Sequence, residues 1–263
     1  MLLVAYVLPW LVAATNNPVL PPTTSWHEHY AYETVRVGDT SPTCVERVTM
    51  QYQTTNGALY MHYRSEHDKG MADEINIRCN LDGSNVVAIK QQYSQKGKRL
   101  SDASIGIANG KVHVEQLLDD GRKKVRSHDT EGKPVAADAS LMALFRFFPF
   151  DQGQTQNVLI ATFTQHFVTM EVKQLGTETL TVPAGSIECY KLEGVVDLFV
   201  TRIRTVYWLN KKEPHFLVRY EGKRGLFLSP SYVTSLVTIG EPQGTNSIDS
   251  PAMTTTNTPS LTR

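Results

Sequence analysis

Most of the chain consists of short segments in which apolar and polar residues alternate, separated by dipeptides that favour tight turns. The turn dipeptides are Asn56-Gly57, Asp82-Gly83, Asn109-Gly110 and Asp120-Gly121, which supply the positive φ angles of two-residue hairpin loops. The alternating segments between them are 59–63, 75–79, 86–93, 104–108 and 112–118. Because short loops join antiparallel neighbours, this pattern predicts an antiparallel meander.

One segment interrupts the alternation. Residues 136–148 are rich in helix formers, and Leu141, Leu144, Phe145 and Phe148 recur at helical spacing along one apolar stripe. We therefore predict one helix packed against the sheet. Alternation then resumes, and we predict further strands at 158–163, 167–174, 178–182, 187–196, 199–209 and 215–220, with a last apolar stretch at 226–239.

A sheet with this many strands does not stay flat, because each strand twists against its neighbour. We predict a mainly β (α+β) fold, in which a large curved antiparallel sheet forms a half-barrel with one helix packed on its concave face. The concavity is either a filled core or a ligand cavity. Both require apolar residues on the inner face, so the pattern fits either.

The two ends of the chain differ from this domain. Residues 2–14 are apolar and end in small residues, which predicts a signal peptide at 1–14, since the run is too short to span a bilayer. The alternative interpretation of this run is a hydrophobic N-terminal strand of a cytosolic protein. We predict a linker at 15–25, one domain at 26–240 and a disordered Thr/Ser/Pro-rich tail at 241–263. No cysteine follows the apolar run for lipid attachment, so we expect an exported, soluble periplasmic protein without a transmembrane span in its mature chain.

The charge balance excludes one class of function. The chain has 26 Lys and Arg residues against 26 Asp and Glu residues, and its formal net charge is zero. A dedicated nucleic-acid binder would normally carry a strongly basic domain, so we expect no nucleic-acid partner.

Motifs that carry chemistry are missing from the sequence. We find no G-x-S-x-G nucleophile elbow, H-E-x-x-H helix, phosphate-binding Gly-rich loop or C-x-x-C pair. His27 and His29 share one face of a strand and could bind one metal ion, but no third ligand is in view, and an exposed polar edge strand is the favoured interpretation. We therefore expect no catalytic residue, no metal and no cofactor, and predict that the protein is not an enzyme.

Three cysteines remain, Cys44, Cys79 and Cys189. In an exported protein they could oxidise, and Cys44 with Cys79 is the favoured pair if these lie on neighbouring strands of the meander. The odd count leaves one thiol, for which a small buried side chain is the favoured role.

Three stretches carry a resemblance to a known family: residues 138–153, Gly176–Gly194 with its Val-Pro-Ala-Gly turn, and Tyr207–Glu221 with its Tyr-Trp-Leu strand. They resemble a bacterial domain-of-unknown-function family, number three-one-zero-eight, whose members are exported envelope proteins. The match is clearest over 138–224. The resemblance implies a fold similar to the curved sheet of the periplasmic lipoprotein carrier and its outer-membrane receptor, and it implies no catalytic residues.

Two functional hypotheses follow. The first is a non-enzymatic envelope protein that binds or carries a lipid or lipidated peptide between sheet and helix, with ligand-binding residues Leu141, Leu144, Phe145, Phe148 and Trp208. The alternative is a structural or protein-interaction module of the envelope with a filled core, which would dock on a partner through its sheet edge or tail. Basic clusters at 96–99, 122–124 and 211–212 either keep the protein soluble or meet anionic headgroups or an acidic partner.

Overall fold

The computed structural model describes residues 24–55, 58–67, 72–80, 87–93, 99–118, 121–137, 141–146, 148–150, 154–198, 201–223 and 230–240. The predicted signal peptide (1–14) and the predicted tail (241–263) lie outside these residues, as does the predicted linker up to residue 23. Thr24 and Ser25, which we assigned to that linker, instead begin the first strand.

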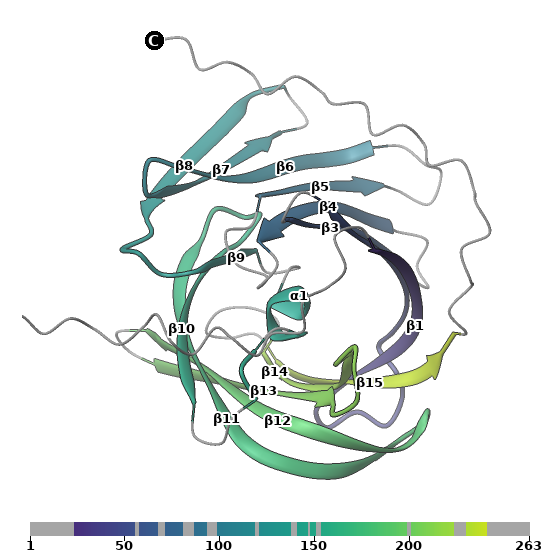
Figure 1. The fold of residues 1–263 in the computed structure, drawn as a ribbon. Helices are drawn as coiled ribbons and strands as arrows, with labels where there is room; N and C mark the ends of the chain where they lie inside the picture. Colours follow the sequence, from purple (N-terminus) through teal and green to yellow (C-terminus); the bar gives the residue numbers. More distant parts are fainter. Residues whose placement is uncertain are drawn as a thin grey trace, which may run out of the picture.

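Within the described residues, 15 strands form one sheet (Figure 1). The elements are β1 Thr24–Arg36, β2 Cys44–Thr55, β3 Ala58–His67, β4 Ala72–Asn80, β5 Val87–Tyr93, β6 Arg99–Ala108, β7 Lys111–Leu117, β8 Lys123–Asp129, β9 Val135–Ala137, α1 Leu141–Arg146, β10 Thr155–Ala161, β11 Phe167–Val182, β12 Gly185–Leu198, β13 Thr201–Asn210, β14 Leu217–Lys223 and β15 Ser231–Ile239. Buried and exposed side chains alternate along many of these strands. In β4, for example, Ile75, Ile77 and Cys79 are buried and the residues between them are exposed.

The strands follow the order β8-β7-β6-β5-β4-β3-β2-β1-β15-β14-β13-β12-β11-β10-β9. Two runs of antiparallel neighbours are therefore joined where the first strand, β1, pairs with the last, β15. Strand β9 differs, because it pairs with β10 in parallel. Strands β8 and β9 are consecutive in the sequence, yet they form the two edges of the sheet.

The turn between β10 and β11 lies against strand β8, at the opposite end of the sheet. Arg126 Nη1 donates a hydrogen bond to the Gln165 carbonyl (3.2 Å), and the Gln165 side-chain amide donates one to the Lys124 carbonyl (2.8 Å). The His128 ring stacks on Phe167, with centroids 5.2 Å apart. The strands accordingly follow a ring in Figure 1, and its two ends meet through these side-chain contacts.

The predicted class is confirmed for the sheet: the fold is nearly all β and consists of one large, open, curved sheet. The predicted helix over the concave face is not supported, because α1 has only six residues. Val135 to Ala137, at the start of the predicted helix, form strand β9 instead. At the other end, Pro149 disfavours a helical conformation of Phe148 and so ends the helix early.

Two predicted turns lie within the described residues. Asn109 and Gly110 have φ angles of 52° and 71°, as a two-residue turn with positive φ at both positions requires. Pro183 and Ala184 connect β11 to β12, and Gly185 follows with a φ of 118°. Asn56-Gly57 and Asp82-Gly83 lie outside the described residues.

The three cysteines are thiols, and none forms a disulfide bond. The favoured Cys44–Cys79 pair is wrong, because Cys44 begins β2 and Cys79 lies in β4, with strand β3 between them. Cys189 is fully buried, and burial raises the pKa of its thiol to about 12. It is therefore protonated at neutral pH and unsuited to nucleophilic chemistry.

Candidate functional site

A buried ion pair joins helix α1 to strand β1. Arg146, at the C-terminal end of α1, donates from Nη1 to Glu28 Oε1 (2.9 Å) and from Nη2 to Glu28 Oε2 (2.5 Å). Tyr30 donates its hydroxyl to Glu28 Oε2 (2.9 Å), and the Arg146 guanidinium lies over the Tyr52 ring, 4.7 Å from its centroid. The side chains of Arg146 and Glu28 are only 6% and 8% exposed. Arg146 Nε is buried and has no hydrogen-bond partner among the described residues.

The surroundings fix the protonation states of this cluster. Burial, with the charge of Glu28 adding to it, raises the pKa of Tyr30 far above its ordinary value, and burial likewise raises the pKa of Tyr52. Burial opposes the charge on Arg146, but Tyr52 and Glu28 outweigh it and raise the pKa of the guanidinium. Arg146 is therefore a permanent positive charge, and both phenols are neutral hydrogen-bond donors.

The four predicted ligand-binding residues of the helical segment come together in the structure. Leu141, Leu144, Phe145 and Phe148 are all buried, between 0% and 8% exposed. Phe145 meets the ring of Tyr207 edge-on, with centroids 4.7 Å apart. The same apolar cluster includes residues of β10 to β13: Val158, Ile160, Met170, Val172, Leu192 and Leu209. We name these residues, with the four of the helical segment and Tyr207, the inner apolar cluster.

Trp208, the fifth predicted ligand-binding residue, is not part of the inner apolar cluster. Because side chains alternate along a strand, it points to the opposite face of β13 from Tyr207. Its indole N–H donates to Glu178 Oε1, and Lys191 Nζ and Arg219 Cζ lie 5.1 Å and 5.7 Å from its ring centroid. The hydrogen bond from Trp208, helped by Lys191, lowers the pKa of Glu178.

Sequence reasoning did not select Glu28, Arg146 or Tyr207. Glu28 stood within the His27-Glu28-His29 motif, which drew attention to its histidines. Strand alternation puts Glu28 on the opposite face from both. Tyr207 is the neighbour of Trp208 on the same strand. Alternation puts the two side chains on opposite faces but does not say which face is the inner one, so the pattern could not select Tyr207 over Trp208.

The two histidines lie on a central strand. Strand β1 pairs with β2 from Thr24 to Thr34 and with β15 from Tyr30 onward, and the Gly240 N–H donates to the His29 carbonyl. The interpretation of the motif as an exposed edge strand is therefore wrong for His29, whereas His27 pairs with β2 alone among the described residues, and both histidines are half-buried. His29 Nδ1 lies 3.3 Å from Thr49 Oγ1. Among the described residues, no group of three His, Cys, Asp or Glu side chains is arranged to hold a metal ion.

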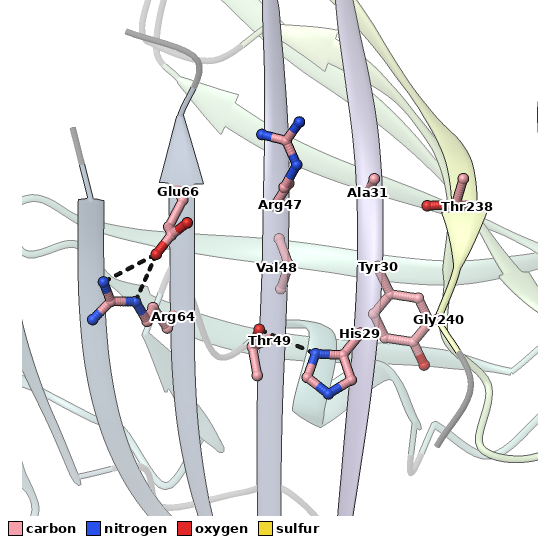
Figure 2. A pocket seen from close by; sticks show the side chains of 10 residues that line it. All are labelled: His29, Tyr30, Ala31, Arg47, Val48, Thr49, Arg64, Glu66, Thr238 and Gly240. Carbon is pink, nitrogen blue, oxygen red and sulfur yellow. Dashed lines mark hydrogen bonds and ion pairs between the residues drawn. The ribbon is translucent and has the colours of Figure 1, made fainter. Parts of the chain in front are cut away.

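A shallow hollow of about 320 Å³ lies beside His29 (Figure 2). Its lining includes Arg47, Arg64, Glu66 and Thr49, and Figure 2 shows these side chains on neighbouring strands of one face. Arg64 is bound to Glu66, with both Nε and Nη2 3.0 Å from Oε1. The hollow therefore carries charged side chains of both signs and shares no residue with the inner apolar cluster.

The helices among the described residues include none that is long and apolar enough to cross a bilayer. The fold and the buried cluster define a β-barrel-like domain with a largely apolar interior, into which the described residues bring the ion pair of Glu28 and Arg146. The chain belongs to the family of proteins of unknown function designated DUF3108, whose model matches residues 32–225. The resemblance seen in the sequence is thereby confirmed.

Solved structures share this architecture. The crystal structure of a β-barrel-like protein of domain of unknown function DUF1849 from Brucella abortus has a TM-score of 0.52 at 10% identity, covering 82% of this chain and 96% of that chain. This likeness shows the fold alone. A search of curated proteins gave no match.

Two other solved structures are less similar. One is a proposed exported protein with a YmcC-like fold from Bacteroides fragilis, with a TM-score of 0.33, 14% identity and coverage of 81% of this chain and 95% of that chain. The other is a proposed lipoprotein from Parabacteroides distasonis, with a TM-score of 0.34, 13% identity and coverage of 83% and 97%.

Proposed function

We propose that this protein is a non-enzymatic binding or carrier protein of the bacterial envelope, which holds a hydrophobic ligand inside its curled sheet. The ligand class is a lipid or the acyl chain of a lipidated peptide. The observation that carries the proposal is the number of strands, 15 in one curved sheet with an apolar inner side.

Strand number sets the width of a curled sheet. About eight strands enclose a space that side chains alone can fill, whereas about 16–18 strands leave a channel. A sheet of 15 strands whose ends meet at Gln165 is closer to the wide end of this range. Its interior therefore requires an occupant besides its own strand side chains, and the described part of that occupant is the short segment that contains α1.

The α1 segment is suited to give way to a ligand. Its described contacts with the sheet are apolar, through Leu144 and Phe145, apart from those of Arg146 with Glu28 and with the Tyr52 ring. An acyl chain can take the place of these contacts with the sheet, because apolar contacts are not directional. The shifted segment can then cover the acyl chain with the same apolar side chains.

Delivery to the envelope is supported by the sequence. The apolar run at 2–14 is typical of an export signal. We propose the periplasm as the site of action.

One observation favours a second candidate, a structural or interaction module with a filled core. Leu141, Leu144, Phe145 and Phe148 are buried by the domain's own side chains. Under this alternative a partner would dock on the exposed edge strand β8, whose residues are all exposed and include Lys123, Lys124 and Arg126.

Native mass spectrometry tests the carrier proposal. The full chain is expressed in a bacterium with its own N-terminus, purified without detergent and measured together with an organic extract of the same sample. Adducts of lipid mass would support the proposal. A peak without adducts that persists after incubation with a bacterial lipid extract would contradict it and favour the filled core.

A pair of substitutions separates the two candidates further. Phe148→Asp places a charge in the inner apolar cluster, and Val125→Asp places one on β8, where Val125 is 61% exposed. If the segment is displaceable, the Phe148→Asp protein keeps its strand circular dichroism but loses lipid binding, while the Val125→Asp protein keeps both. In a filled core, Phe148→Asp unfolds the domain, because the charge has no partner there.

A further inference from the structure

The inner apolar cluster adjoins one permanent positive charge. Arg146 follows directly on the α1 residues Leu144 and Phe145, which belong to that cluster, and its own side chain is 6% exposed. A charge in such a place costs desolvation energy, and a pair of apolar residues of similar size in place of both Arg146 and Glu28 would often be about as stable. The buried position of Arg146 therefore indicates a role other than stabilising the fold.

The hydrogen bonds of Arg146 are incomplete. Glu28 takes one hydrogen bond from each Nη atom, and the Tyr52 ring lies against the guanidinium. The buried Nε–H has no partner among the described residues. Buried donors are rarely left unpaired, so an unpaired N–H on a charged guanidinium marks a position where an anionic oxygen would bind favourably.

We propose that Arg146 recognises the anionic head of an amphiphilic ligand, a carboxylate or a phosphate, while the ligand's apolar tail contacts the inner apolar cluster. Glu28 is the counter-ion that neutralises the guanidinium when no ligand is bound. Tyr30 donates its hydroxyl to Glu28, and the Tyr52 ring lies against the guanidinium, so both contacts hold the two charged side chains in place. This inference rests on the proposed carrier function and specifies its ligand class.

The role of Glu28 makes the test specific. Its carboxylate repels an arriving anion and competes for the guanidinium, so Glu28→Gln should bind an anionic amphiphile more tightly. Glu28→Gln/Arg146→Met removes both charges and should abolish the preference for an anionic head. Arg202→Met is the matched control. Arg202 lies on strand β13, is 51% exposed and forms an ion pair with Asp197 of strand β12.

The experiment uses the delipidated full chain after export and isothermal titration with oleic acid and oleyl alcohol, which share a tail and differ in head charge. The unmodified protein and Arg202→Met should bind oleate about tenfold more tightly than the alcohol, as expected for one hydrogen bond to a charged group. Glu28→Gln should strengthen oleate binding several-fold and leave alcohol binding unchanged. The double variant should bind both equally. Lysophosphatidic acid, titrated in parallel, distinguishes a phosphate from a carboxylate head.

Two failures are distinguishable. If the unmodified protein binds oleate and oleyl alcohol equally, or the double variant retains the preference for oleate, the head-group role of Arg146 is refuted and the carrier function stands. If no probe binds, including the uncharged alcohol, the carrier function itself is refuted and the head-group role with it.

Discussion

The buried pair of Glu28 and Arg146 allows a thermodynamic prediction with a clear sign. We consider the single variants Glu28→Gln and Arg146→Met and the double variant that combines them. Arg146→Met leaves the Glu28 carboxylate in an apolar interior without its cation, and Glu28→Gln leaves the guanidinium without its anion. Breaking a buried pair in this way costs about 3–5 kcal/mol.

The double variant should be more stable than either single variant. It removes the charges of both Glu28 and Arg146. The amide oxygen that Glu28→Gln introduces can still accept a hydrogen bond from the Tyr30 hydroxyl. The double variant's loss of stability should therefore be about 1–3 kcal/mol, the cost of incompletely bonded polar groups. The two substitutions are non-additive by at least about 3 kcal/mol.

Urea unfolding followed by circular dichroism measures the four free energies of unfolding. The slope m should stay constant across the set, so that shifts of the midpoint report stability alone. The matched cycle is Asp197→Asn with Arg202→Met, whose side chains are 73% and 51% exposed and should couple by less than about 1 kcal/mol. Additivity within about 0.5 kcal/mol at Glu28 and Arg146 would refute the reasoning, because it would mean that the pair is not desolvated in solution.

Three further predictions concern single positions. Gly194→Ala should destabilise by about 1–3 kcal/mol, because the added Cβ would lie 2.7 Å from Met170 Sδ in a filled region, whereas Gly106→Ala, with nothing within 4 Å, should be near neutral in the same urea assay. Trp208→Phe removes the indole hydrogen bond that lowers the pKa of Glu178. The stability gained from that lowered pKa is present above the unfolded-state pKa of Glu178 and is lost as the pH falls through its folded-state pKa. Thermal melts below about pH 5 should therefore show a smaller acid-induced loss of stability in the variant than in the unmodified protein. Cys189 should react with a thiol reagent only as fast as the domain unfolds, since it is buried; prompt labelling at neutral pH would contradict its placement.

Local sequence features predicted much of the sheet. Alternation located β3, β4, β6 and β7 to within a few residues, and turn chemistry located the Asn109-Gly110 and Pro183-Ala184 connections. The pattern missed β2 and β8 as strands, assigned part of β9 to the helix, and indicated β1 only as an edge strand around His27 and His29. Tyr30 and Met50 point inward between polar residues, but β1 is rich in histidine, glutamate and tyrosine, whose polar groups weaken the apolar signal of a buried face.

Long-range pairing was beyond the sequence pattern. Tyr32 pairs with Leu236 where β1 meets β15, and nothing in the alternation of either segment specifies that partner. The same holds for the candidate site, since Glu28 and Arg146 lie 118 positions apart and meet only when the sheet has curled. The choice between Tyr207 and Trp208 also depended on how the sheet curls. Alternation assigns the two residues to opposite faces of the strand, but only the curled sheet shows which face is the inner one.

The filled interior and the proposed ligand binding are compatible when the energies are compared. Exposing Leu141, Leu144, Phe145 and Phe148 to water would cost about 1.5–3 kcal/mol each, together comparable to the whole stability of a domain. The α1 segment therefore stays inside the sheet unless another apolar group takes its place, and its apolar side chains are buried there. A ligand whose tail offers similar apolar area to the sheet offsets the contacts that the segment gives up with Tyr207 and its neighbours. Burial of these side chains by the domain itself is thus compatible with a carrier that has a displaceable occupant. It follows that the effect of Phe148→Asp on folding separates the two functional candidates, and that the degree of burial does not.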